Sequence, residues 1–184
     1  MTTIKGLKTI SRSTLSGELR TILTPLIEGA IRDQIFPGCS IGVWIKGHGP
    51  YYLSWGHIEY GDASVPVTGH TLFDLASLTK PLVTAILTLD LVARGRFKLN
   101  STLKEVTGLG PCPREKSSIE ILHLLHHQSG LPSWLPLYEG FRGVAQVTQA
   151  ILDTPLRSPP GTTTEYSDLG FILLGAIICE LEGR

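Results

Sequence analysis

The 184-residue sequence predicts an α+β fold from three observations. Apolar residues recur at helical spacing over roughly residues 14–34. Two strand patterns follow, at 39–46 and 51–56, with the glycine- and proline-containing turn 47–50 between them. A long apolar helical pattern then occupies roughly 77–94, and further helices follow it. Helices and an antiparallel hairpin in separate stretches of the chain are typical of an α+β protein.

The N-terminal elements follow from apolar spacing and from residues that break helices. Residues 1–13 form a polar lead-in, and the amphipathic helix over 14–34 ends just before Pro37. In the hairpin, Trp44 and Trp55 are expected to pack as cross-strand neighbours.

The elements after the 77–94 helix are shorter and are interrupted by glycine and proline. Residues 99–118 are expected to be irregular, and a short helix pattern covers 119–126. A further helix is expected over 143–153. Ser167 or Asp168 can cap the last helix, which is expected to continue to the end of the chain.

Composition and charge favour a globular protein. Apolar residues make up 42% of the chain and charged residues 17%, with 16 basic and 16 acidic side chains. No basic patch interleaved with aromatic residues stands out, so we expect no nucleic-acid partner. The three cysteines show no paired spacing, so neither a disulfide framework nor a metal site is expected. Three histidines are expected in core or capping roles, because no carboxylate or cysteine stands at ligand spacing: His123, His126 and His127.

Targeting and membrane signals are weak in the sequence. The first residues lack the apolar core of a signal peptide, which favours a cytoplasmic location. The apolar run over 169–179 is too short to cross a bilayer, so no membrane span is expected.

The stretch that suggests chemistry is Ser77-Leu78-Thr79-Lys80. Positions i and i+3 of a helix share a face, so the serine hydroxyl and the lysine amine can meet. Serine is a weak nucleophile until a base takes its proton, and a lysine with a lowered pKa can be that base. Pro81 suits a first helical turn, so Ser77 is expected at a helix N-terminus, where free N–H groups favour negative charge. The stretch therefore predicts an acyl-transferring serine enzyme.

The same spacing occurs at Ser101 and Lys104, and about one chance match is expected in a chain of this length. Context separates the two matches. Ser77 precedes a long apolar helical pattern, whereas Ser101 follows the polar residues that end this pattern. Ser101 is therefore expected to cap a turn.

A second cluster, Tyr166-Ser167-Asp168, lies on a loop that leads into the last helix. Its side chains can face a cleft, and a phenol held near Lys80 could share or relay the serine proton. The alternative is structural, because a tyrosine before a helix is commonly a packing residue and Ser-Asp is an ordinary cap.

In their order, these pieces resemble the serine β-lactamase and penicillin-binding-protein superfamily. The resemblance is to the branch of class C-like β-lactamases, D-alanyl-D-alanine carboxypeptidases and related esterases. Three blocks carry it: a Ser-x-x-Lys block over 73–80, a Leu-Leu-x-His-x-Ser-Gly-Leu-Pro block within 121–132, and a Pro-Gly…Tyr-Ser-Asn-x-Gly block within 160–175. The resemblance covers roughly residues 18–183.

The resemblance implies a set of roles. Ser77 would form an acyl-enzyme on an amide or ester, Lys80 would assist its deprotonation, and Tyr166 would be the second proton-transfer group. The Ser77 backbone N–H would supply half of an oxyanion hole. The substrate would be a small molecule or peptide, namely a β-lactam, a D-Ala-D-Ala peptide or an ester. No cofactor and no metal are expected.

The resemblance also implies an antiparallel sheet flanked by helices, with a helical region inserted between early and late strands. Residues 14–184 would form this domain, shortened at its C-terminus because the late strands are missing. The family's third motif, Lys or His, then Thr or Ser, then Gly, does not occur in the sequence. A truncated frame, a split gene with a separately encoded C-terminal half, and a remnant all stay open. The alternative function is therefore a catalytically silent fragment or binding module.

One residue departs from the family pattern at the site itself. Asp168 stands where the family usually has a substrate-binding asparagine. An ionised aspartate cannot donate a hydrogen bond to a substrate carbonyl, and a carboxylate near Lys80 would raise the lysine pKa. We expect Asp168 to weaken Lys80 as a base or to change the choice of substrate.

Overall fold

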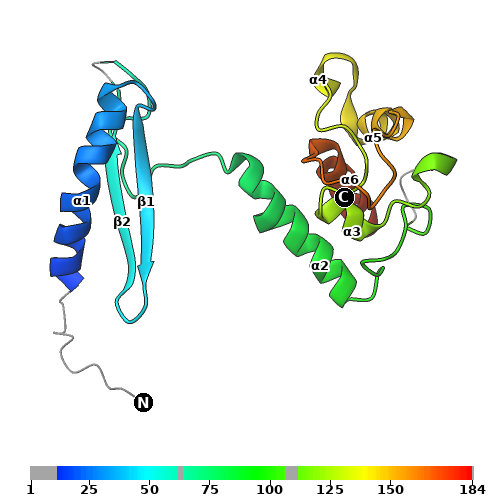
Figure 1. Cartoon of the computed structure of the whole chain (residues 1–184), viewed down its shortest axis with the longest axis horizontal. Coiled ribbons are helices and arrows are strands. Elements are labelled where there is room, and N and C mark those ends of the chain that lie inside the picture. Colours follow the sequence, from blue (N-terminus) through cyan, green and yellow to red (C-terminus); the bar gives the residue numbers. More distant parts are fainter. Residues whose placement is uncertain (1–11, 62–63, 107–111, 184) are drawn as a thin grey trace. The chain divides into compact units, whose positions relative to one another are not determined.

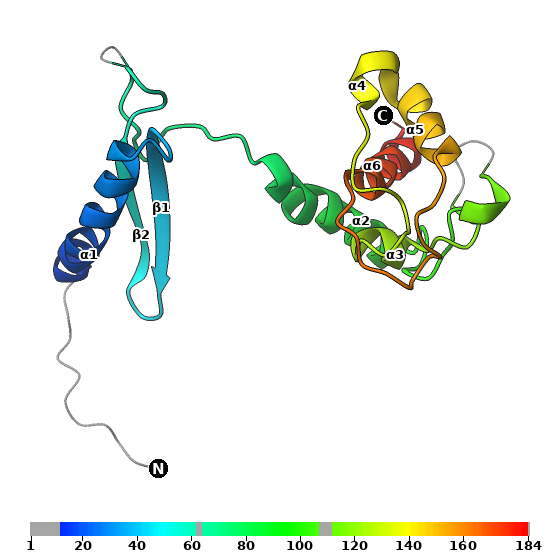
Figure 2. The ribbon, with the colours of Figure 1, turned by 45° about the horizontal axis from the view of Figure 1, so that its top comes forward.

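A computed structural model describes residues 12–61, 64–106 and 112–183. Most of the polar lead-in expected at 1–13 lies outside these residues. The chain divides into two compact units, Met1–Asp74 and Leu75–Arg184. Figures 1 and 2 show the helices and strands of each unit.

The N-terminal unit is built from one helix and a two-stranded antiparallel sheet. Helix α1 (Arg12–Arg32) runs along the hairpin of β1 (Gly38–Ile45) and β2 (Gly49–Gly56), as Figure 1 shows. Alternate residues of β2 are buried, as expected for a strand with one covered face: Tyr51, Leu53 and Trp55. The indole N–H of Trp55 donates a hydrogen bond to the Thr24 hydroxyl on α1 at 3.1 Å. The predicted helix and hairpin are therefore confirmed.

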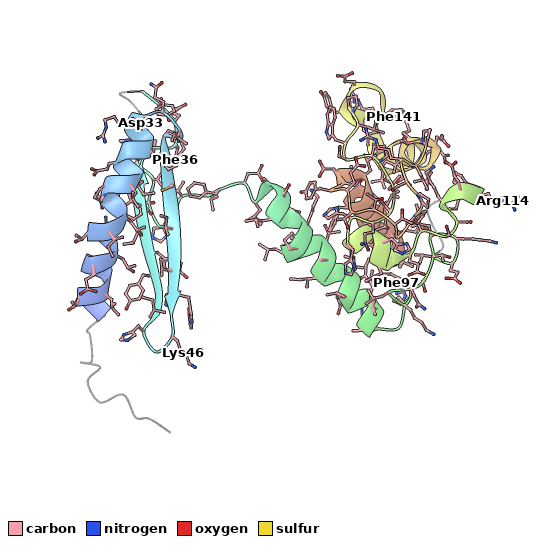
Figure 3. All side chains as sticks on the ribbon, in the orientation of Figure 1. Asp33, Phe36, Lys46, Phe97, Arg114 and Phe141 are labelled. Carbon is pink, nitrogen blue, oxygen red and sulfur yellow. The ribbon has the colours of Figure 1, made fainter. Side chains whose placement is uncertain are left out.

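The strand register contradicts the predicted pairing of the two tryptophans. Trp44 lies opposite Pro50, and Trp55 lies opposite Cys39. Trp55 points to the buried face, whereas Trp44 points to the other face and is 74% exposed. The reason is the turn, which is tighter than predicted and brings Gly49 and Pro50 into β2; Lys46 marks this end of the hairpin in Figure 3.

The C-terminal unit consists, in its described residues, of helices and the loops that join them. The stretch expected to be one helix is a 3₁₀ turn, a π-helix and an α-helix in succession: η1 (Ala76–Leu78), η2 (Lys80–Ala85) and α2 (Ile86–Ala93). The elements that follow are η3 (Arg114–Lys116), α3 (Ile121–Leu125), α4 (Leu137–Gly140), α5 (Gly143–Asp153) and α6 (Asp168–Glu182). The predicted helices within 119–126 and over 143–153 are confirmed, whereas η3 and α4 were not predicted.

Helix α6 packs against α2, α3 and α5, and its buried side forms the centre of the core. Its core residues are almost inaccessible to solvent: Leu169, Leu173, Leu174 and Ile177. Facing residues come from α3 and α5, namely Ile121, Leu124, Ile151 and Leu152, and Phe97 joins them just after α2 (Figure 3). Gly183, with φ of 70°, ends α6, so the expectation that this helix continues to the end of the chain is wrong.

The loop after α3 is hydrogen-bonded to the segment that leads into α6. The Arg157 N–H donates to the Gly130 carbonyl at 2.8 Å, and the Gly161 N–H donates to the Gln128 carbonyl at 2.8 Å. Gly130 has φ of 78°, and a Cβ there would overlap the Ser158 carbonyl oxygen, so the close approach requires glycine. These bonds fix the segment that carries Tyr166.

By length and composition alone, the helical stretch Ala76–Ala93 is apolar enough to cross a membrane; no other helix in the described residues meets this criterion. A single such helix is weak evidence, because core helices of globular proteins meet the same criterion. The expectation of no membrane span stays a prediction.

Candidate active site

Ser77 lies in the 3₁₀ turn η1, directly after a residue in an unusual backbone conformation. Ala76 has φ of 44°, in the left-handed region that side chains other than glycine rarely adopt. Such a residue costs about 1–3 kcal/mol and is found more often at functional sites than elsewhere. The following η2 is a π-helix that begins at Lys80 and has Pro81 in its first turn, as predicted. The serine and the lysine thus start an irregular, locally strained helix.

The Ser77 hydroxyl is hydrogen-bonded to the phenol of Tyr166, which lies 89 positions later in the sequence. The two oxygens are 2.9 Å apart, with the phenol as donor to Ser77 Oγ. Tyr166 is 51% exposed and Ser77 is exposed as well, so the pair is open to solvent. The hydrogen bond with Ser77, and next the hydrogen bond and positive charge of Lys80, lower the pKa of Tyr166.

Lys80 is held by a carboxylate. Its ammonium lies 2.7 Å from Asp168 Oδ1, and its side chain is 17% exposed. It also lies 5.2 Å from the centre of the Tyr166 ring and 5.8 Å from that of Phe171. Burial lowers the pKa of Lys80, but the hydrogen bonds and charges of Asp168 and Tyr166 outweigh it, so the pKa is raised. Lys80 is therefore a cation at neutral pH.

Asp168 is the first residue of α6, where the helix dipole favours a negative charge. Its N–H donates to the Ser133 carbonyl at 2.8 Å, which ties the start of α6 to the loop after α3. Its Oδ1 atom is buried and has no well-oriented hydrogen bond, so the Lys80 ammonium is its charge partner. Asp168 and Lys80 thus neutralise each other beside the serine.

Three other residues discussed from the sequence have structural positions. Ser167 caps α6, because its hydroxyl accepts from the Gly170 N–H at 3.4 Å and donates to the Pro132 carbonyl at 2.7 Å. His123 caps α3 by accepting from the Glu120 N–H at 3.2 Å. Ser101 accepts from the Lys98 N–H at 3.1 Å, which places the second Ser-x-x-Lys match in a turn, as predicted.

The structure therefore brings together all four residues predicted for the site, Ser77, Lys80, Tyr166 and Asp168. Sequence reasoning missed His127, whose ring lies against Tyr166 with ring centres 4.5 Å apart. The signal was present, because His127 is the histidine of the block within 121–132. Among residues 12–61, 64–106 and 112–183, no group of three or more His, Cys, Asp or Glu side chains could hold a metal ion.

Comparison of the sequence with known proteins identifies the family that the sequence motifs resemble. A family model described as Beta-lactamase matches residues 23–184. A putative D-alanyl-D-alanine carboxypeptidase of Escherichia coli O157:H7 is 31% identical over 172 residues, which cover 83% of this chain and 39% of that protein. A protein of the same description from Salmonella heidelberg (strain SL476) is 28% identical over 174 residues, covering 83% and 40%. The chain thus spans about two fifths of the length of these relatives.

Solved structures show the same fold. The structure of SurE with D-Leu matches with a TM-score of 0.73 and 28% identity, over 91% of this chain and 38% of SurE. A β-lactamase/D-alanine carboxypeptidase from Pseudomonas syringae matches with a TM-score of 0.78 and 24% identity, over 91% and 46%. The octameric penicillin-binding protein homologue from Pyrococcus abyssi matches with a TM-score of 0.73 and 25% identity, over 89% and 39%. The predicted α+β, β-lactamase/transpeptidase-like fold is confirmed.

Proposed function

The chain belongs to the β-lactamase family, and on that premise we propose that it carries the acylation centre of a serine hydrolase. Ser77 is the nucleophile, and its target is the carbonyl of an amide or an ester. The observation that carries this proposal is the 2.9 Å hydrogen bond between the Tyr166 phenol and the Ser77 hydroxyl. A nucleophile within hydrogen-bond reach of a proton acceptor is the arrangement that activates serine.

Tyr166 takes the serine proton in this scheme. Its lowered pKa gives more phenolate near neutral pH than an ordinary tyrosine has. The phenolate oxygen then accepts the Ser77 hydroxyl hydrogen, and the proton moves to it as Oγ bonds the carbonyl carbon. Lys80 stays protonated beside Asp168 and stabilises the phenolate by its positive charge. This role differs from the expectation drawn from the sequence, in which Lys80 assists the deprotonation of Ser77.

The remaining steps follow from proton balance. The carbonyl electron pair moves to oxygen when Ser77 attacks, and the Ser77 backbone N–H is proposed to stabilise that oxyanion. Tyr166 returns the proton to the leaving nitrogen or oxygen as that bond breaks, which leaves an ester on Ser77. Water then attacks the ester carbonyl as Tyr166 accepts its proton. The bond between the acyl carbon and Ser77 Oγ breaks, and Tyr166 returns the proton to Oγ, which releases the acid and restores the Ser77 hydroxyl.

The substrate class is proposed from the relatives and from Asp168. The curated relatives are described as putative D-alanyl-D-alanine carboxypeptidases, so a D-alanyl peptide is the first candidate, with β-lactams and esters next. Asp168, 39% exposed in its side chain, is proposed to contact the substrate as an acceptor only. It therefore favours a substrate that offers an N–H or a cationic group.

The second candidate is a catalytically silent module that keeps this part of the fold. One observation favours it: Asp168 holds Lys80 as a cation, so Lys80 cannot accept the Ser77 proton. A silent module would keep the Ser77–Tyr166 hydrogen bond without reacting with a substrate.

The two candidates are separated by covalent labelling with a fluorophosphonate and with a fluorescent penicillin. We expect the parent to be labelled and Ser77→Ala to be unlabelled. Ser101→Ala is the matched control, because it removes a serine with the same spacing to a lysine and should leave labelling unchanged. A folded parent that takes up neither probe supports the silent module, and labelling that survives in Ser77→Ala excludes Ser77 as the nucleophile.

A further inference from the structure

We propose that His127 is a positioning residue that holds the Tyr166 phenol against Ser77. This inference rests on the proposed role of Tyr166 as the proton acceptor. In this proposal His127 acts on Ser77 only through Tyr166.

His127 binds the backbone on both sides of Tyr166. Its carbonyl oxygen accepts from the Glu165 N–H at 2.9 Å, and its Nδ1 accepts from the Ser167 N–H at 3.0 Å. A residue whose two neighbours are bonded to the same partner has little freedom to shift along the chain. The two bonds therefore fix the point from which the phenol extends.

The imidazole also packs against the tyrosine side chain itself. The ring centres of His127 and Tyr166 are 4.5 Å apart, with the planes inclined by 33°. The ring of Phe171, one turn into α6, lies 5.0 Å from the imidazole at 36°. Contacts at these distances restrict the rotamers of all three rings. His127 therefore restricts the orientation of the phenol as well as the backbone position of Tyr166.

The backbone of His127 shows that its side chain is present for a reason other than capping. His127 follows the C-cap of α3 and has φ of 56°. The Gln128 N–H donates to the His123 carbonyl and the His127 N–H donates to the Leu124 carbonyl, which is the Schellman arrangement. Glycine is the usual residue at this left-handed position. The cap alone would therefore favour glycine, and the contacts with 165–171 account for histidine.

The charge state of the ring fits this role. Nδ1 accepts a hydrogen bond, so the neutral tautomer carries its proton on Nε2. The charged groups that face the ring are Lys80 from η2 and Asp168 from α6. Burial, and then the Lys80 charge, lower the pKa of His127, while the Asp168 charge acts the other way. The ring therefore stays neutral, and Nδ1 stays an acceptor, at neutral pH.

The decisive variant is His127→Gly. Glycine is the preferred residue for the left-handed cap, so the variant keeps the backbone and removes only the ring and its acceptor. Tyr166 ionisation is measured by ultraviolet difference titration of the full chain, with Tyr166→Phe defining the contribution of this one phenol. We expect the Tyr166 titration to move upward, toward that of an ordinary tyrosine. Where the parent is labelled by the fluorophosphonate, the labelling rate should fall by up to about 100-fold, the effect of misplacing a reacting group by 1 Å.

Two further variants complete the test. His127→Asn tolerates the left-handed backbone and offers a side-chain acceptor, so it should restore part of the titration shift. His126→Asn changes the neighbouring, exposed histidine and should behave as the parent. An unchanged Tyr166 titration in folded His127→Gly overturns the inference, as does an equal change in His126→Asn. If His127→Gly does not fold, His127→Asn becomes the test. A Tyr166 titration and a labelling rate that both equal those of the parent then overturn the inference. Absence of labelling in the parent counts against the proposed function alone, because the titration needs no reaction.

Discussion

Lys80 and Asp168, which are far apart in the sequence, form an ion pair with a distance of 2.7 Å. Lys80 lies at the start of η2 and Asp168 at the start of α6. The pair raises the pKa of Lys80 against the effect of burial. It therefore decides which residue beside Ser77 can accept a proton.

Asp168→Asn should speed acylation at neutral pH. The variant removes the carboxylate that raises the pKa of Lys80 and whose charge also opposes ionisation of Tyr166. Both changes favour an unprotonated acceptor for the Ser77 proton, so the acid limb of the rate profile should move to lower pH. The measurement is the rate of fluorophosphonate labelling from pH 5 to pH 9.

Asp90→Asn is the matched control for this experiment. Asp90 pairs with Arg94 at 3.0 Å on α2, so its variant also removes one ion pair but leaves Lys80 untouched. Equal rates for Asp168→Asn and the parent would remove the idea that Asp168 restrains the proton acceptor.

Tyr166→Phe should lower the acylation rate by about 10²–10⁴-fold, the usual contribution of a general acid–base group. Phenylalanine keeps the ring that packs on His127 and removes only the oxygen that is bonded to Ser77. Tyr138→Phe is the control, since Tyr138 is an exposed residue that packs on Trp134. A Tyr166→Phe protein that is labelled as fast as the parent would assign the proton to another acceptor.

The sequence predicted the four residues of the site because their signals are local. The i, i+3 spacing of Ser77 and Lys80 places them on one side of a helix in any fold that keeps the helix. Tyr166 lies just before an apolar helix and Asp168 is the first residue of that helix, and Ser167 is recognisable from the sequence as its cap. That the two segments meet was implied by the family resemblance, not by spacing.

The features that sequence reasoning missed depend on tertiary contacts. His127 looked like one of three ordinary histidines, because its left-handed backbone and its bonds to residues 165 and 167 exist only after α3 and α6 pack. The pairing of Trp44 with Trp55 failed for a similar reason. Register depends on the turn between the strands. The observed turn over 46–48 is one residue shorter than the predicted turn over 47–50, and the register shifts by an odd number of residues, which puts these side chains on opposite faces.

Gly130→Ala should destabilise the C-terminal unit by about 1–3 kcal/mol or more, the cost of a strained backbone position. Its φ of 78° is unfavourable for alanine, and the new methyl group would meet the rigid Ser158 carbonyl. Gly140→Ala is the control, because an added Cβ there meets no atom within 4 Å and the effect should stay within about 0.5 kcal/mol. Urea denaturation followed by circular dichroism compares the two, and equal midpoints would show that the Gly130 loop relaxes freely.

His127 should make the protein less stable in acid. Its pKa is lowered from the ordinary value of 6.5, chiefly by burial, so below pH 6.5 the unfolded chain binds a proton that the folded chain does not. The contribution to the free energy of unfolding is therefore full above pH 6.5 and is lost as the pH falls toward the lower pKa of the folded state. Urea denaturation at pH 7.5 and pH 5 measures this loss, which should be smaller in His127→Asn than in the parent and unchanged in His126→Asn. Parallel losses in all three proteins would show that His127 is solvated enough to titrate normally.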